Sequence, residues 1–167
     1  MLAVYPYPTN AEAEQAARDV FRDSNLAWGT WVQALLRSES GRSKTYVYYF
    51  DHYSPQARLG LAHGAEYCYV VGNLEAPCGP AGLRGPLGPE DTALSRLMMS
   101  YWVNFAKTGG PNGSGPPHWP AFSASSQRVM YLDTRPYAGP VPNARMLKTL
   151  DAYFSRMRDE AKKKQAN

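Results

Sequence analysis

This sequence lacks a membrane-length apolar run, a basic stretch at its start and enough cysteines for a disulfide framework. No apolar run approaches the ~18 residues that cross a bilayer, so we expect no membrane span. The opening residues, MLAVYPYPTN, have no basic start and contain two prolines, so we expect no signal peptide here. The two cysteines, Cys68 and Cys78, are too few for a disulfide framework and wrongly spaced for a zinc knuckle. They either pair or stay free, and we assign no compartment from them.

Charge is also scarce: 19% of the 167 residues are charged, and the net charge is +4. Lys162, Lys163 and Lys164 supply most of this excess, and no aromatic residue is interleaved with them, as a surface for single-stranded nucleic acid requires. We therefore expect no nucleic-acid partner, and a frayed basic tail over residues 162–167. An apolar fraction of 44% provides for a packed core, while 14 glycines and 14 prolines predict long loops.

The first part of the chain is typical of two helices. Asn10 precedes an Ala- and Glu-rich stretch, residues 11–17, which it is placed to cap. Ser24 is placed to cap a second helix, and Gly41 lies where a helix ends in a left-handed residue. The apolar residues of the second helix recur at helical spacing: Trp28, Trp31, Val32, Leu35 and Leu36.

Residues 44–50 (KTYVYYF) predict a strand that is covered on both faces, because β-branched and aromatic residues follow one another without alternation. Helices before and after this strand indicate an α/β fold, with a partial sheet and flanking helices. Residues 51–67 predict a loop, and residues 67–71 fit a short helix or a strand equally well. Residues 77–89 are rich in Gly and Pro and predict a stiff linker.

The strongest helical pattern begins at Asp91 or Thr92, either of which is placed to cap it, and ends at Gly109. Residues 129–133 predict a short strand, and a last helix is expected from Asn143. The residues expected to face inward are Leu94, Leu97, Met98, Tyr101, Trp102 and Phe105 in the first of these helices and Leu147, Leu150, Phe154 and Met157 in the second.

Among the three histidines, His63 is the candidate for chemistry. It follows the predicted strand, and open α/β sheets gather functional groups beyond the carboxyl ends of their strands. An imidazole takes up and returns a proton near neutral pH, as a general base does. Gly64 would let backbone or substrate approach closely, and Glu66 lies near enough in sequence for acid–base pairing. A surface or satisfied loop histidine is the alternative for His63, and it is our interpretation of His52 and His118.

Motifs that would complete a catalytic site are absent. The sequence contains no Gly-x-Ser-x-Gly nucleophile elbow, no His-Gly-Gly oxyanion stretch and no Ser-x-x-Lys. It also contains no His-Glu-x-x-His, no phosphate-binding glycine loop and no Cys-x-x-Cys, so we expect no metal and no cofactor. Reasoning from the residues thus leaves a candidate base without a nucleophile.

Four motifs follow one another along the chain: HGAE at 63–66, VGN at 71–73, DTALSRLMMSYWVNFAKTGGPN at 91–112 and WPAF at 119–122. In this order and spacing they resemble the C-terminal third of a type-B carboxylesterase, in the carboxylesterase and cholinesterase branch of the α/β-hydrolases. Residues 19–21 and 46–50 resemble the stretch that precedes the histidine in bacterial members. The resemblance runs from about Tyr5 to Met157.

The resemblance implies that residues 1–167 are the C-terminal part of a carboxylesterase domain with an α/β-hydrolase fold. In this family the triad follows the chain order Ser, then Glu or Asp, then His, and His63 matches that histidine. It would take a proton from the serine hydroxyl and return it to the leaving alcohol, with Glu66 and Gly64 in supporting positions. The serine, the triad acid and the oxyanion glycines belong to family segments upstream of residue 1.

The leading hypothesis is therefore a fragment of a serine carboxylic-ester hydrolase, whose complete form acts on a small-molecule carboxylic ester. We expect the fragment alone to be inactive, because a general base contributes about 10²–10⁴-fold and needs a group to deprotonate. The alternative is a non-catalytic interaction module that retains the hydrolase scaffold. In either case a strand cut from a larger sheet exposes edge groups and an apolar face, so we expect self-association.

Overall fold

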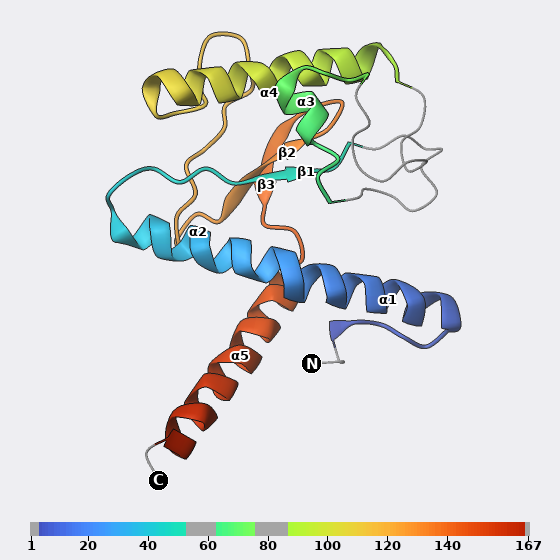
Figure 1. Cartoon of the computed structure of the whole chain (residues 1–167), viewed down its shortest axis with the longest axis vertical. Helices are drawn as coiled ribbons and strands as arrows, with labels where there is room; N and C mark the ends of the chain where they lie inside the picture. The colour runs from blue at the N-terminus through green and yellow to red at the C-terminus, as the bar shows by residue number, and fades with distance from the viewer. Residues whose placement is uncertain (1–3, 53–62, 76–86, 166–167) are drawn as a thin grey trace.

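The computed structural model describes residues 4–52, 63–75 and 87–165. Within these residues a three-stranded sheet lies between two layers of helices (Figure 1). This arrangement confirms the predicted α/β class with a partial sheet and flanking helices. In chain order the elements are α1 (Asn10–Arg22), a π-helical turn (Asp23–Ala27), α2 (Trp28–Ser40), β1 (Tyr48–Phe50), α3 (Tyr67–Val71), α4 (Pro89–Thr108), β2 (Arg128–Leu132), β3 (Tyr137–Pro140) and α5 (Ala144–Gln165).

The two predicted N-terminal helices form one continuous helical run. The cap of α1 is Thr9, whose Oγ1 accepts a first-turn backbone N–H at 3.3 Å, and the expected cap, Asn10, is already helical. Ser24 is not a cap either, because it lies in the π-helical turn and its hydroxyl donates to the Val20 carbonyl at 2.7 Å. The run ends at Gly41, whose φ of 64° confirms the predicted left-handed stop.

The sheet has the strand order β1-β2-β3, with β1 parallel to β2 and β2 antiparallel to β3. Tyr48 lies opposite Met130 across the parallel pair. Of the predicted strand over residues 44–50, only the last three residues form regular strand structure. Strand β3 was not predicted, because Gly139 and Pro140 are residues that strands disfavour.

Both faces of the sheet are covered, as the unbroken apolar run predicted. Alternate residues of the run face opposite layers: Tyr46, Tyr48 and Phe50 pack towards α3 and α4, and Val47 and Tyr49 pack towards α2. The buried residues of the α3–α4 layer and its sheet face are Tyr69, Leu94, Met98, Tyr101, Trp119, Met130 and Leu132. Those of the opposite layer are Trp31, Ala34, Phe122, Val129 and Leu147.

Helices α3 and α4 pack together on one face of the sheet (Figure 1). The ambiguous segment at 67–71 is helical. Helix α4 is capped by Gly88 rather than by Asp91 or Thr92, because the helix begins earlier than expected. Asp91 instead accepts the Gly88 N–H on its Oδ2 at 2.6 Å, which satisfies one donor of the first turn. The predicted linker lies largely outside the described residues.

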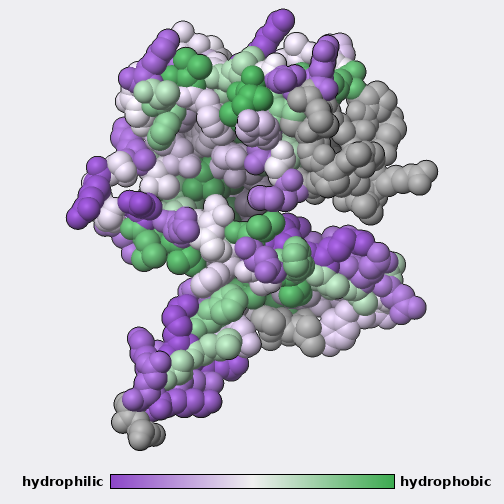
Figure 2. All heavy atoms as spheres, in the orientation of Figure 1, coloured by the Kyte–Doolittle hydropathy of each residue, from purple (hydrophilic) through white to green (hydrophobic). Residues whose placement is uncertain are grey.

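Helix α5 extends away from the rest of the molecule (Figure 1). Leu147 and Leu150 are buried, and Phe154 packs on Trp28 with ring centroids 4.4 Å apart. The inward placement expected for Met157 is wrong: this side chain is 47% exposed, on the part of α5 that projects outward. The same expectation is wrong for Phe105, near the end of α4, whose side chain is 49% exposed. The helix continues through the three lysines to Gln165, where we expected a frayed tail. Hydrophilic side chains gather along this outer part of α5 (Figure 2).

Within the described ranges, every helix is too short or too polar to cross a membrane.

Candidate functional site

The turn at residues 63–66 carries the predicted base directly ahead of α3. Gly64 has a φ of +80°, a left-handed conformation that glycine adopts without strain. A Cβ built at this glycine would meet nothing within 4 Å, so backbone conformation rather than crowding favours glycine here. The Tyr67 N–H donates to the Gly64 carbonyl at 3.2 Å and joins the turn to the helix. The His63 side chain is exposed.

Glu66 fastens the same turn to the sheet. This half-buried carboxylate accepts a hydrogen bond from Tyr48 Oη, on β1, at 3.3 Å. Burial, and next the nearby Glu66 charge, raise the pKa of Tyr48 to about 12. The phenol therefore remains a donor throughout the neutral range. The structure thus brings Gly64 and Glu66 together with His63 in one turn and gives that turn a contact with β1.

A buried polar cluster that sequence reasoning missed lies beside this turn. His52 lies two residues beyond the end of β1, with its Nε2 2.8 Å from Asp91 Oδ1 and its Nδ1 3.3 Å from Asp133 Oδ1. Tyr69 Oη donates to the same Asp91 oxygen at 2.5 Å. His52 and Asp91 are buried, whereas the Asp133 side chain is 44% exposed. The interpretation of His52 as a satisfied histidine is confirmed.

Both acids of this cluster are held in the charged form. Burial acts to raise the pKa of Asp91, but hydrogen bonds from Tyr69, the Gly88 N–H and His52 outweigh it and lower that pKa. Burial likewise acts to raise the pKa of Asp133, and the Thr134 N–H and hydroxyl together with His52 lower it overall. A carboxylate only accepts hydrogen bonds, so a ring nitrogen of His52 that carries a proton donates to the acid it faces.

The two histidines therefore differ in what they can do. Both ring nitrogens of His52 are directed at carboxylates, so neither faces a hydroxyl nucleophile. His63 is exposed on a turn, where a second group can reach it. His118 is exposed in the loop before Trp119, as expected for a surface histidine. No group of three or more His, Cys, Asp or Glu side chains in the described part of the chain is arranged to hold a metal ion.

Two further features bear on this region. Cys68 is buried in α3 and is disulfide-bonded, which settles the state of this thiol that the sequence left open. Cys78 lies outside the described residues.

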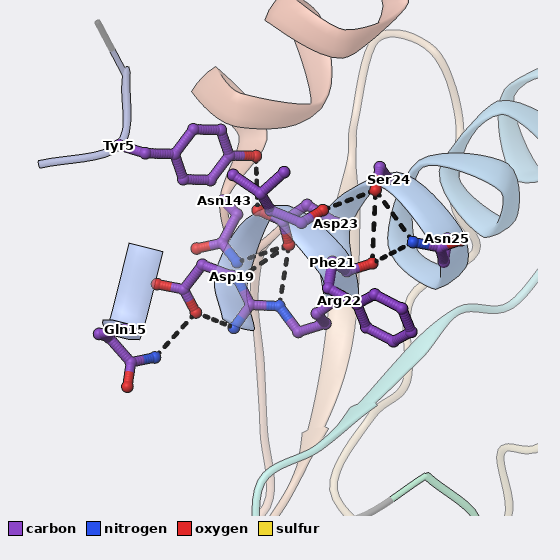
Figure 3. A network of polar contacts seen from close by, with 10 residues as sticks. Tyr5, Gln15, Asp19, Phe21, Arg22, Asp23, Ser24, Asn25 and Asn143 are labelled. Atoms are coloured by element: carbon purple, nitrogen blue, oxygen red, sulfur yellow. Dashed lines mark hydrogen bonds and ion pairs between the residues drawn. The ribbon is translucent and has the colours of Figure 1, made fainter. Parts of the chain in front are cut away.

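A second polar cluster, centred on Asp23, lies on the far side of the sheet (Figure 3). Asp23 is fully buried and accepts hydrogen bonds from Tyr5 Oη at 3.1 Å, Arg22 Nε at 2.8 Å and Asn143 Nδ2 at 3.3 Å. Burial, and next the Asp23 charge, raise the pKa of Tyr5 to about 12. Because these donors come from the N-terminal segment, α1 and the residue before α5, the cluster joins three parts of the chain.

The layered architecture, with a histidine on a turn after a sheet strand, is that of part of an α/β-hydrolase. The family model described as "Carboxylesterase family" matches residues 4–154. The chain therefore belongs to the carboxylesterase family, as the motifs indicated.

Individual relatives agree with this assignment. The chain is 37% identical to acetylcholinesterase of Gallus gallus over 127 residues, which are 73% of this chain and 16% of the relative. It is 31% identical to carboxylesterase 4A of Bos taurus over 120 residues, 69% of this chain and 20% of the relative. It is 34% identical to cocaine esterase of Oryctolagus cuniculus over 131 residues, 73% of this chain and 24% of the relative.

Two consequences follow from these relatives. The chain spans about a fifth of the length of the curated relatives it matches. These relatives are vertebrate proteins, so the bacterial character suggested by residues 19–21 and 46–50 is not supported.

Proposed function

We propose that this chain supplies the general-base histidine, His63, of a serine carboxylic-ester hydrolase. The observation that carries the proposal is the family match over residues 4–154. In the complete enzyme the acyl group of a small-molecule carboxylic ester passes to a serine and then to water, which yields an alcohol and an acid. This chemistry uses no metal and no organic cofactor.

His63 takes the proton of the serine hydroxyl as that oxygen attacks the ester carbonyl, and then gives the proton to the leaving alcohol. Both transfers need the imidazole within hydrogen-bond reach of the reacting oxygen, about 3 Å. The exposure of His63 supports this role, because a serine and a substrate can approach the ring. The buried His52, with carboxylates at both nitrogens, does not suit it.

The nucleophile comes from outside these 167 residues, because the sequence contains no nucleophile elbow. From the order of motifs in the family, we assign the triad acid and the oxyanion donors to upstream segments as well. Among the described strands, β1 is paired on one side only. We assign the continuation of the sheet to this open edge. Strands that pair there in parallel with β1 would place their carboxyl-end loops beside the turn at residues 63–66, as functional loops are placed in this class of fold.

A chimera tests the proposal directly. Residues 4–154 replace the matching segment of the Oryctolagus cuniculus cocaine esterase, and hydrolysis of p-nitrophenyl butyrate is measured. We expect His63→Gln to lower kcat by about 10³-fold or more, as loss of a triad member does. His118→Gln is the matched control, because it changes an exposed histidine remote in sequence from the turn and should leave kcat unchanged. Cooperative unfolding of each variant establishes that it is folded.

The outcomes separate the two functional classes. Full activity of a folded His63→Gln chimera would refute the proposal. A folded chimera that hydrolyses nothing would favour the alternative, a non-catalytic interaction module with the hydrolase scaffold. The 167-residue chain by itself should hydrolyse p-nitrophenyl esters no faster than free imidazole. A saturable rate from that chain, lost in His63→Ala and accompanied by a titratable covalent site, would also contradict the proposal.

A further inference from the structure

One carboxylate, that of Asp91, contacts the chain on both sides of the segment that leads to His63. Before that segment, His52 Nε2 lies 2.8 Å from Asp91 Oδ1. After it, Tyr69 Oη donates to the same oxygen at 2.5 Å. The rings of His52 and Tyr69 also meet edge to face, with centroids 5.7 Å apart. Two stretches that flank residues 53–62 therefore converge on a single atom of α4.

Tyr69 is connected to the turn by backbone hydrogen bonds. Its own N–H donates to the Glu66 carbonyl at 3.0 Å, and within the turn the Tyr67 N–H donates to the Gly64 carbonyl at 3.2 Å. From α4, Ser95 Oγ donates to the Tyr69 carbonyl at 2.9 Å. The side chain and the backbone of Tyr69 are thus both fixed to α4, and the turn at residues 63–66 is continuous with that fixed point.

Asp91 is itself held in place by the start of α4. Its Oδ2 accepts the Gly88 N–H at 2.6 Å, and a carboxylate in the first helical turn is favoured by the helix dipole. The residue is buried. Asp133 faces the other nitrogen of His52 at 3.3 Å and fixes the orientation of that ring. The carboxylate of Asp91 cannot shift without breaking contacts to three segments of the chain.

We propose that Asp91 is a positioning residue for His63. Through Tyr69 it fixes α3 and the turn at residues 63–66, and through His52 it fixes the end of the chain that precedes residues 53–62. The kinetic consequence of this inference rests on the proposed function. Catalytic groups work within about 0.5 Å of their productive geometry, and a misplacement of about 1 Å can cost about 100-fold in rate.

The first test uses the 167-residue chain and a matched pair of variants. Tyr69→Phe removes the hydroxyl that reaches Asp91. Tyr101→Phe removes a hydroxyl from the same apolar cluster, where it donates to the Pro117 carbonyl at 2.6 Å. We expect Tyr69→Phe to speed amide hydrogen exchange of residues 64–71 about tenfold or more, which corresponds to losing a hydrogen bond to a charged group. Tyr101→Phe should leave the exchange of those amides near that of the unsubstituted chain.

The second test measures kinetics in the chimera. Tyr69→Phe and Asp91→Asn should each lower kcat about tenfold with little change in KM, because a displaced base affects the reaction more than substrate binding. The double variant should be no slower than the slower single variant, because both substitutions break one linkage. His52→Gln removes the other contact of Asp91, the one to the His52 ring, and should also speed amide hydrogen exchange at residues 64–71.

Each result decides one of the two proposals. If the amides of residues 64–71 exchange at the same rate in Tyr69→Phe and Tyr101→Phe, the positioning role of Asp91 is overturned, whatever the activity of the chimera. An equal fall of kcat in these two variants overturns it as well. If His63→Gln retains full activity, the proposed function fails, and the exchange comparison still decides whether Asp91 fixes the turn. Where Tyr69→Phe does not fold, Asp91→Asn and His52→Gln give the same comparison.

Discussion

His52 and Asp133 meet at the ends of two neighbouring parallel strands, with Nδ1 and Oδ1 3.3 Å apart. His52 lies just beyond β1, and Asp133 directly follows β2. Parallel strands end at the same edge of a sheet, so residues 81 positions apart in sequence become neighbours there. The same edge is joined to the turn that carries His63, because His52 contacts Asp91 and Asp91 in turn accepts a hydrogen bond from Tyr69 of α3.

The acids of this cluster predict how stability depends on pH. The pKa of Asp91 is lower in the folded chain than the unfolded value of about 3.9. Its ionised form therefore stabilises the fold above the unfolded pKa, and this contribution is lost as pH falls through the folded pKa. We expect Asp91→Asn to lower the urea midpoint at pH 7 and to make its decline below about pH 4 shallower.

Asp159→Asn is the control for this measurement, because it removes an exposed carboxylate from α5. Its urea midpoint should follow the unsubstituted chain at every pH. Asp51 contributes with the opposite sign, because burial and next the Asp133 charge raise its pKa. That contribution is the same in Asp91→Asn and in the control, so the difference between the two profiles reports Asp91. If the urea midpoints of Asp91→Asn and Asp159→Asn declined equally with falling pH, the lowered pKa assigned to Asp91 would be contradicted.

What the sequence predicted well are features that neighbouring residues determine. The apolar spacing predicted α2 and α4, and Gly41 and Gly109 stop them in left-handed conformations as expected. The unbroken apolar run before His52 predicted a strand covered on both faces. The four motifs at 63–66, 71–73, 91–112 and 119–122 predicted the family, because their order and spacing are read directly along the chain.

What the sequence did not reveal depends on partners distant in the chain. His52 is 39 positions from Asp91, and no spacing rule joins them. Asp91 was taken for a helix cap because a first-turn acid and a cap have similar sequence neighbours. Strand β3 exists because β2 offers it hydrogen bonds, although its own residues disfavour strands. Met157 follows the apolar spacing of α5 but lies on the part of the helix that projects outward.

The Asp23 cluster predicts a large loss of stability on substitution. Asp23→Ala leaves the side chains of Tyr5, Arg22 and Asn143 without their common acceptor. Because Arg22 remains partly exposed to water, we expect a cost of about 2 kcal/mol, below the roughly 3–5 kcal/mol lost when a fully buried charge pair is broken. Equilibrium denaturation in urea measures it.

Asp19→Asn provides the comparison for Asp23. Asp19 also pairs with Arg22, at 2.8 Å from Nη1, but this pair is partly exposed. Its loss should cost about 0.5 kcal/mol or less, as surface ion pairs do. Similar losses for Asp19→Asn and Asp23→Ala would contradict the role assigned to the buried acid.

Self-association of the isolated chain stays a prediction, now with a defined surface. The edge of β1 that lies away from β2 has no partner strand in the described part of the chain. Exposed apolar side chains on α3 and α4 include Tyr67, Val71, Val103 and Phe105. Free strand edges and exposed apolar surface both promote association. Sedimentation velocity at several concentrations should show species larger than a monomer, and a monodisperse monomer that melts cooperatively would contradict this.

Two glycines predict stability changes of opposite sign. Gly139 lies in β3, where an added Cβ would stand 2.7 Å from Tyr131 Cε2 and 3.1 Å from Tyr137 Cε2. These two rings are stacked, with planes 3° apart and centroids 4.8 Å apart, and Tyr131 also meets Tyr49 edge to face. The Tyr131 ring is thus held by contacts with two other rings, and yielding to the added methyl group would disturb them. We expect Gly139→Ala to destabilise the fold by about 1–3 kcal/mol, as overpacking does.

Gly29 lies in α2, and a Cβ added there meets nothing within 4 Å. The unfolded chain has fewer backbone conformations with alanine at this position than with glycine, so it loses less entropy when the helix forms. Gly29→Ala should therefore stabilise the fold by about 0.5–1 kcal/mol. Both variants add one methyl group, so the difference between their changes in unfolding free energy reports the surroundings of each glycine and not the added group itself. Thermal and urea denaturation of the two variants measure it. Destabilisation by Gly29→Ala, or stability gained by Gly139→Ala, would show that α2 or the β2–β3 pair is packed differently from this structure.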